Sequence, residues 1–179
     1  MSRMRLSVAL SLAMVAAAPV PLMAQTAPVD PVTVFLQHNR TAQGVVETPS
    51  GLQYKVIAPG DGGVRPSDAD VVLITYKGML TDGTTFDEAA RPTPMPVAEV
   101  VPGFSEGLKL MPRGATYRFW IKPELGYGDA ATGPIPAHSI LVFDLQLLDF
   151  KSMDEIRRMQ AQMQQQQGAA PAVPASGTP

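Results

Sequence analysis

The residues that most often carry enzyme chemistry are scarce in this sequence. It has no cysteine, and its two histidines, His38 and His138, lie far apart with no second ligand at metal-like spacing. Neither histidine has a plausible nucleophile as its partner, and no paired-metal motif occurs. These features argue against a hydrolase, a thiol nucleophile and a metal site. We expect no cofactor.

Aromatic and hydroxyl side chains are the remaining candidates. Tyr76, Phe86, Phe104 and Phe143 each stand where an ordinary core would take an aromatic residue, so each one alone is more typical of packing than of a site. Tyr127 differs, because it lies between two glycines in a loop and has no evident core role. The net charge is -2 with no basic stripe. Partners should therefore be recognised by shape and apolar contact, and nucleic acid is not expected.

The segments that must position these residues are mostly strand-like. Val71–Leu80 carries apolar residues on both faces, which is typical of a central strand. Asp82-Gly83 predicts a hairpin turn into a return strand at Thr84–Asp87. Apolar and polar residues alternate along Thr116–Lys122 and Ile140–Phe150, which predicts two further core strands.

One segment within this region favours a helix. Pro102–Leu110 and the residue after it place Phe104, Leu108 and Met111 at spacings of four and three. Gly107 costs about 1 kcal/mol of helix propensity relative to alanine, so packing against the sheet must hold the helix. We therefore expect an α+β fold in which an antiparallel sheet wraps across one short α-helix.

The flanking segments have another composition. Val32–Arg40 predicts a short helix that needs a partner surface, and Gly44–Ser50 links it to the core. Lys151–Gln167 predicts a polar helix with a thin apolar stripe that could contact a partner, and a disordered low-complexity tail follows. The expected organisation is a signal peptide at 1–24, a lead with a short helix at 25–50, one folded domain at 51–150, and the polar helix and tail at 151–179.

The N-terminal sequence indicates export. Arg3 and Arg5 precede the apolar run Leu6–Val20, and the small residue Ala24 follows. The run is shorter than the roughly 20 residues that span a bilayer, so a stable membrane span is not expected. We predict a secretory signal peptide cleaved after Ala24 and a periplasmic or secreted mature protein.

Four segments in order resemble an FKBP-type peptidyl-prolyl cis-trans isomerase: GLQYKVIAPGDG, VLITYKGMLTDGTTFD, VVPGFSEGLKLMPRG and ELGYGDAATGPIPAHSILVFDLQLLDF. The specific signal is their order and near-family spacing, because YKGML or GYG alone would recur by chance. The preceding FLQHNRTAQGVVETPSGLQYKV is similar to the exported bacterial branch that includes the macrophage infectivity potentiators. A helical region before the domain can dimerise in that branch, but little helix remains here.

The resemblance implies an isomerase with an apolar, proline-accepting cleft between sheet and helix. Three residues match catalytic positions of the family: Tyr76, Asp87 and Tyr127. Six match substrate-binding positions: Phe86, Val100, Val101, Phe104, Ile135 and Phe143. The backbone N–H of Val101 is the implied donor to a substrate carbonyl. The implied chemistry is rotation about the amide bond before proline, which needs neither a nucleophile nor a metal.

Three features qualify this assignment. Phe104 stands where the family usually has an indole, so the pocket floor has less aromatic area. The proline-rich segment Arg91–Val97 replaces a stretch with an aromatic wall residue, and no catalytic role is assigned to Thr93 or Met95. Asp87 could simply end its strand in solvent; the functional alternative is an electrostatic role that orients Tyr76 or the substrate carbonyl.

The expected partners are proline-containing polypeptides, and the resemblance adds macrolide immunosuppressants as ligands. Either a monomer or a weak dimer is compatible with the short helix before the domain. The rival interpretation is a proline-binding chaperone or assembly module that keeps the fold and the pocket but isomerises weakly.

Overall fold

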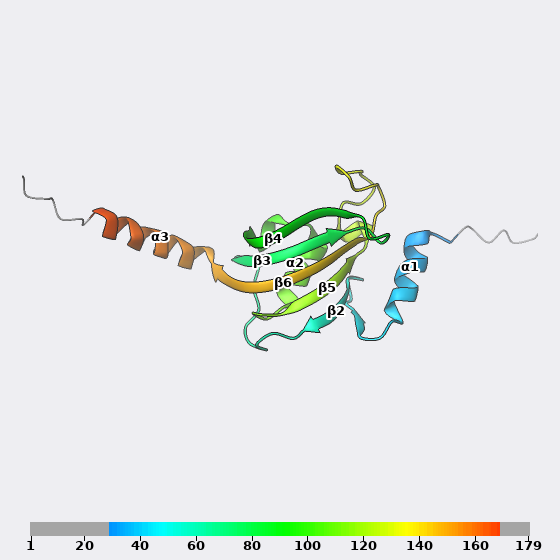
Figure 1. The fold of residues 1–179 in the computed structure, drawn as a ribbon, viewed down its shortest axis with the longest axis horizontal. Helices are drawn as coiled ribbons and strands as arrows, with labels where there is room; N and C mark the ends of the chain where they lie inside the picture. The colour runs from blue at the N-terminus through cyan, green and yellow to red at the C-terminus, as the bar shows by residue number, and fades with distance from the viewer. Residues whose placement is uncertain (1–28, 169–179) are drawn as a thin grey trace, which may run out of the picture.

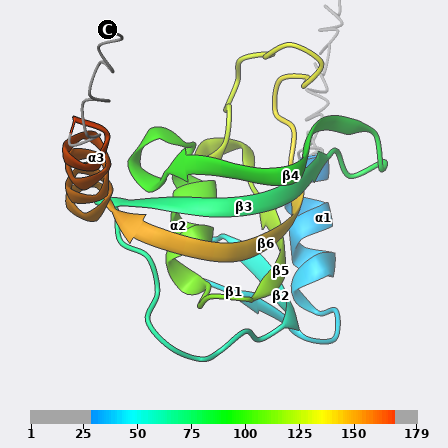
Figure 2. The same cartoon turned by 60° about the vertical axis from the view of Figure 1, so that its left-hand side comes forward.

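The computed structural model describes residues 29–168, and their main feature is one six-stranded antiparallel sheet with the strand order β1-β2-β5-β6-β3-β4. The strands are β1 (Val45–Glu47), β2 (Gln53–Ala58), β3 (Asp70–Met79), β4 (Thr85–Pro96), β5 (Thr116–Ile121) and β6 (Leu141–Ser152). The helices are α1 (Pro31–Arg40), α2 (Pro102–Leu110) and α3 (Met153–Gly168), with short 3-10 helices η1 (Val97–Glu99) and η2 (Pro123–Leu125). Figures 1 and 2 show α2 crossing one face of the sheet. The expected α+β fold is confirmed.

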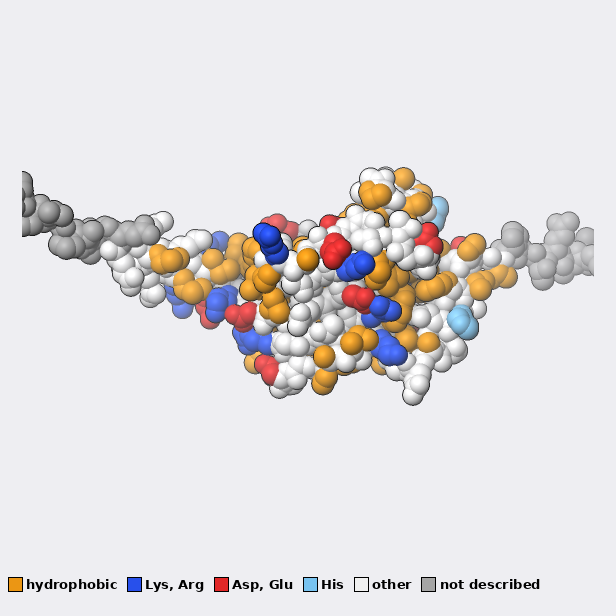
Figure 3. Space-filling model, in the orientation of Figure 1, with side chains coloured by type: hydrophobic (Ala, Val, Ile, Leu, Met, Phe, Trp, Pro, Cys, Tyr) orange, Lys and Arg blue, Asp and Glu red, His pale blue; other side chains and the backbone are white. Residues whose placement is uncertain are grey.

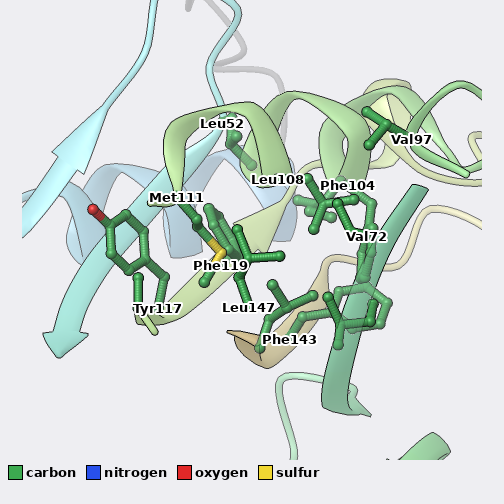
Figure 4. Packing of buried hydrophobic residues seen from close by; sticks show 14 of the residues in the cluster. Leu52, Val72, Val97, Phe104, Leu108, Met111, Tyr117, Phe119, Phe143 and Leu147 are labelled. Atoms are coloured by element: carbon green, nitrogen blue, oxygen red, sulfur yellow. The ribbon is translucent and has the colours of Figure 1, made fainter. Parts of the chain in front are cut away.

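The core lies between α2 and the sheet. Phe104, Leu108 and Met111 are buried as their spacing predicted, and Figure 4 shows them packed among side chains of the strands. Gly107 is needed where α2 approaches β5, because a Cβ atom there would lie 2.9 Å from the ring of Phe119. Packing therefore offsets the helix-propensity cost of Gly107, as expected.

The strand β4 is longer than the sequence indicated. The predicted return strand ended at Asp87, whereas β4 continues to Pro96, and its pairing with β3 shifts between Ile74 and Tyr76. The prolines of the segment Arg91–Val97, where no strand was predicted, alternate along this part of β4. They are tolerated because β4 forms the edge of the sheet. A backbone N–H that points to the open side of an edge strand has no partner strand, so a proline there costs no ladder hydrogen bond.

The segment before the domain is attached to the sheet by a buried glutamine. Gly44–Ser50 was expected to be a link, but β1 forms within it and pairs with β2. The side chain of Gln53 is fully buried, donating to the carbonyl oxygen of Leu36 at 2.9 Å and to Glu47 at 2.6 Å while accepting from Asn39 at 2.9 Å. This network provides the partner surface that the short helix α1 needs.

The helix α1 begins at a clear N-terminal signal. Asp30 accepts hydrogen bonds from the backbone N–H groups of Val32 and Thr33, and Pro31 occupies the first turn. The expected apolar side of this helix, which includes Phe35 and Leu36, is half-buried against the domain.

The other end of the chain leaves the domain as a helix. Strand β6 runs directly into α3, and Ser152 and Glu155 form a reciprocal capping box at the junction. Figure 1 shows α3 projecting away from the sheet. Among residues 29–168, no helix combines the length and apolar character needed to cross a bilayer. The predicted signal peptide and the low-complexity tail beyond Gly168 lie outside the described residues.

The outer face of the sheet, opposite α2, carries mixed charge. Figure 3 shows acidic and basic side chains interspersed over the face in view. Arg118 and Asp144, paired directly across β5 and β6, form a two-pronged ion pair with distances of 2.6 and 2.7 Å. The mixture leaves no extended basic surface for nucleic acid on that face.

Candidate active site

A cavity of about 290 Å³ opens beside the N-terminus of α2. Its lining comes from five elements and two loops: Tyr76, Asp87, Met95, Glu99, Val100, Val101, Phe104, Tyr127 and Phe143. Seven of the nine residues selected from the sequence are in this set. The other two, Phe86 and Ile135, lie outside the lining, and Met95 and Glu99 were not selected.

The floor of the cavity is aromatic and rigid. Phe143 on β6 meets Phe104 on α2 edge-to-face, with ring centroids 4.9 Å apart, and it meets Tyr76 on β3 in the same way at 6.1 Å. Phe104 and Phe143 are both buried. Such edge-to-face pairs contribute roughly 0.5–1.5 kcal/mol each beyond the area they bury. The floor therefore belongs to the core and to the cavity at once.

The polar centre of the cavity is a hydrogen bond between Tyr76 and Asp87. The register pairs Gly78 with Asp87 and Tyr76 with Ala89, so Tyr76 and Asp87 are diagonal neighbours on one face of the β3–β4 ladder. The Tyr76 hydroxyl donates to Asp87 Oδ2 at 2.7 Å. Burial, reinforced by the hydrogen bond and the charge of Asp87, raises the pKa of Tyr76 to about 12. Tyr76 is thus a neutral donor near pH 7.

The first residue that falls outside the lining, Phe86, supports the cavity from behind. Its ring packs edge-to-face against Phe143 with centroids 5.5 Å apart. Gly78 makes this contact possible, because a Cβ atom there would lie 2.7 Å from the Phe86 ring and 2.9 Å from Phe143. Gly78 is therefore a positioning residue that sequence reasoning passed over; an isolated glycine inside a strand was its available signal.

The second such residue, Ile135, anchors a loop. It is buried in the core, and it pairs with Thr132 in the loop that follows Tyr127. The same loop is closed at its base, where the N–H of His138 donates to the carbonyl oxygen of Gly128 at 3.0 Å. Ile135 thus holds the Tyr127 loop against the domain instead of facing the cavity.

The N-terminus of α2 fixes the wall formed by Val101. Pro102 follows, which restricts Val101 to an extended backbone, and its ψ is 148°. The Val101 carbonyl oxygen accepts from the N–H groups of Phe104 and Ser105, each at 3.0 Å. The Val101 N–H donates no hydrogen bond within residues 29–168, so it is available to a ligand.

Tyr127 is held at the mouth of the cavity by a tight turn. The N–H of Gly128 donates to the carbonyl oxygen of Pro123 at 2.8 Å, and the positive φ of 61° at Gly128 suits glycine. The side chain of Tyr127 is 41% exposed. Its hydroxyl can therefore reach a bound ligand while remaining in contact with water.

The two lining residues missed from the sequence lie on or just after β4. Met95 pairs with Val72, and Glu99 belongs to η1. Thr93, Met95 and Val97 alternate with prolines, and this period of two was the available signal for a strand. Met95 thus occupies the wall that had no sequence assignment.

No metal centre accompanies the cavity in the described part of the chain. Within residues 29–168, no three His, Cys, Asp or Glu residues gather closely enough to hold an ion. His38 lies on α1, and His138 lies in the loop after Tyr127, where its Nδ1 is 3.2 Å from Asp129.

Comparison with known families finds two matches within the described chain. Residues 62–148 match the FKBP-type peptidyl-prolyl cis-trans isomerase family, and residues 29–56 match the domain amino-terminal to that isomerase. The crystal structure of FkpA from Escherichia coli is similar, with a TM-score of 0.64 and 38% identity over 68% of this chain and 58% of that one.

Two curated relatives are an FKBP-type isomerase and a protein named as an outer membrane protein. The isomerase FkpA of Aeromonas hydrophila is 43% identical over 117 residues, which cover 64% of this chain and 43% of that protein. A Legionella longbeachae protein named outer membrane protein MIP is 40% identical over 121 residues, or 65% of this chain and 52% of the relative. The match thus spans about half of each relative's length.

Proposed function

Because the chain belongs to the FKBP-type peptidyl-prolyl cis-trans isomerase family, we propose that its cavity accelerates rotation about X–Pro bonds in exported polypeptides. The observation that carries this proposal is the buried floor of Phe104 and Phe143 beneath a half-buried Tyr76. A prolyl ring is apolar, compact and lacks an N–H group, so it suits an aromatic floor of this size.

The reaction requires selective binding, not bond making. Rotation about an amide meets a barrier of about 18–20 kcal/mol, because the planar bond loses resonance when it twists. The twisted amide has less charge on its oxygen, so it loses less than the planar form on leaving water. A water-poor aromatic cavity therefore binds the twisted state better than either planar isomer, which lowers the barrier.

The polar groups of the cavity orient the substrate. In this proposal the Val101 N–H, which donates no hydrogen bond within residues 29–168, donates to a substrate carbonyl, and the hydroxyl of Tyr127 donates from the mouth of the cavity. The bond from Tyr76 holds the carboxylate of Asp87 in one orientation beside the rotating amide. None of these groups needs to exchange a proton, which agrees with the raised pKa of Tyr76.

The test is a protease-coupled assay on a peptide with one X–Pro bond. The wild-type chain is expected to accelerate the slow phase, and Asp87→Ala is expected to lower kcat/KM by roughly tenfold, equivalent to about 1.4 kcal/mol. Asp154→Ala on the exposed α3 removes the same charge away from the cavity and serves as the control. A wild-type rate equal to the uncatalysed rate would refute isomerase activity.

A second candidate function is a proline-binding chaperone with weak isomerase activity. The observation that favours it is Phe104, which offers less aromatic area than the indole usual in the family. An experiment that measures both peptide isomerisation and suppression of aggregation of an unfolded client distinguishes the two functions.

The same floor supports a further proposal, binding of macrolide immunosuppressants. Titration of the chain with such a macrolide would test it.

Export is proposed on sequence grounds. The basic and apolar pattern before Ala24 supports a cleaved leader, and one relative carries the name of an outer membrane protein. N-terminal sequencing of the protein from the periplasm is expected to start at Gln25. An intact Met1 on the protein would contradict cleavage.

A further inference from the structure

The charged side chains that line the cavity are all acidic. Asp87 and Glu99 are the charged residues of the lining, and no lysine or arginine belongs to it. Within the described residues, neither carboxylate forms an ion pair with a cationic side chain. The Asp87 carboxylate accepts instead from the Tyr76 hydroxyl and from the N–H of Glu88, and both of these partners are uncharged donors.

The two carboxylates share the cavity with the aromatic floor. Phe104 and Phe143 form the buried floor, so a prolyl ring seated there directs the adjoining peptide units outward. Asp87 on β4 and Glu99 on η1 are both exposed and line the same cavity. A side chain directly before or after the proline must therefore pass near one or both of them.

Exposed carboxylates still attract or repel a charged substrate side chain that passes near the cavity. The Debye length is about 8 Å at physiological ionic strength, and it exceeds the length of a glutamate side chain. A cationic residue of the substrate is thus attracted and an anionic one repelled, whichever rotamer Glu99 adopts. Individual exposed pairs are weak, on the order of 0.2–1 kcal/mol. Two carboxylates that attract a lysine and repel a glutamate together give a measurable difference in kcat/KM between the two substrates.

We propose that the cavity prefers X–Pro bonds with lysine or arginine next to the proline over those with aspartate or glutamate, and that Glu99 is a specificity-determining residue. This inference rests on the proposed isomerase function and names its substrate class. Glu99 acts through the charge of its carboxylate and needs no direct hydrogen bond to the rotating amide. Asp87 contributes to the same field but also orients Tyr76, so Glu99 is the cleaner residue to change.

The test compares matched peptides with lysine, glutamine or glutamate next to the proline, in separate series before and after it. Exchange NMR measures kcat/KM directly, which avoids the charge preference of a coupling protease. With the full chain at about 10 mM salt, where the Debye length is about 30 Å, the lysine peptide is expected to exceed the glutamate peptide by roughly threefold to tenfold in at least one series. The ratio should fall toward one near 1 M salt.

Variants assign the effect to the cavity. Glu99→Gln is expected to lower the lysine-to-glutamate ratio by at least about twofold at low salt, whereas Asp154→Asn on α3 should leave it unchanged. Equal acceleration of all the peptides, or an unchanged ratio in Glu99→Gln, would overturn the inference while leaving the isomerase proposal intact. Failure to accelerate any peptide would refute the isomerase proposal and the inference with it.

Discussion

The floor and the rim of the cavity are built on different physical terms. The floor residues Phe104 and Phe143 are about 6% exposed and pack into the core, so the fold and the site depend on the same contacts. The rim residues Asp87 and Glu99 are exposed and unpaired with cations in the described chain, so the fold hardly needs them. Substitutions should therefore separate the two regions, with stability falling for the floor and activity alone for the rim.

The largest expected effect is at the floor. Phe143→Ala removes edge-to-face contacts with Tyr76, Phe86 and Phe104 and leaves a cavity in the core. Loss of a buried phenylalanine costs about 3–5 kcal/mol of unfolding free energy, which urea titration would measure. A loss below about 1 kcal/mol would show that the ring is not part of the core.

Gly78→Ala should have a smaller effect of the same kind. The new methyl group would overlap the rings of Phe86 and Phe143, and overpacking of this sort costs about 1–3 kcal/mol. Thermal unfolding would measure the cost, with Gly63→Ala as the control, because Gly63 has no positive φ and a Cβ atom there would meet only the side chain of Asp61, at 3.3 Å. Wild-type stability in Gly78→Ala would mean that the aromatic rings can move apart freely.

Asp87→Ala provides the contrast at the rim. It removes a hydrogen bond from the Tyr76 hydroxyl, which is half-buried and can turn to water, so unfolding free energy should fall by at most about 1 kcal/mol. Together with the tenfold loss of kcat/KM expected above, this result would show that Asp87 contributes to activity and little to stability. A stability loss as large as that of Phe143→Ala would erase the distinction between floor and rim.

The smallest expected effect is a pH dependence at Tyr76. Its pKa is raised from 10.0 to about 12, so folding favours the neutral phenol, and the resulting stability is fully present below pH 10 and is lost as pH rises toward 12. Burial also raises the pKa of Tyr117, so tyrosinate absorbance should show late-ionising tyrosines, and Tyr76→Phe should remove one of them. A titration in which Tyr76→Phe removes an ordinary tyrosine near pH 10 would contradict the raised pKa of Tyr76.

The sequence predicted the floor better than the rim, for a physical reason. Aromatic residues at alternating strand positions and at helical spacing can be recognised as core residues because burial enforces periodicity, and the family resemblance then assigned Phe104 and Phe143 to the cavity. Glu99 lies in a single 3-10 turn, which is too short to show a period. Met95 was missed because a strand of alternating prolines is acceptable only at a sheet edge, and the edge position of β4 depends on the whole topology.

The flanks show the same limit. The helix α1 was visible from its apolar spacing, yet the strand β1 was interpreted as a link because three residues carry too little pattern. Gln53 reads as an ordinary polar residue of a strand, but it is fully buried and joins α1 to the sheet. Its burial depends on three partners that lie at separate positions along the chain, and a local sequence pattern cannot predict these contacts.

The central claim is that the aromatic floor lowers the barrier to rotation of the X–Pro amide. Phe104→Leu tests it most directly, because leucine keeps the floor apolar and near the original volume while removing the ring. Exchange NMR on one X–Pro peptide should show clear acceleration by the wild type and a drop in kcat/KM of roughly tenfold or more in a folded Phe104→Leu chain. Equal rates for Phe104→Leu and wild type would contradict the account.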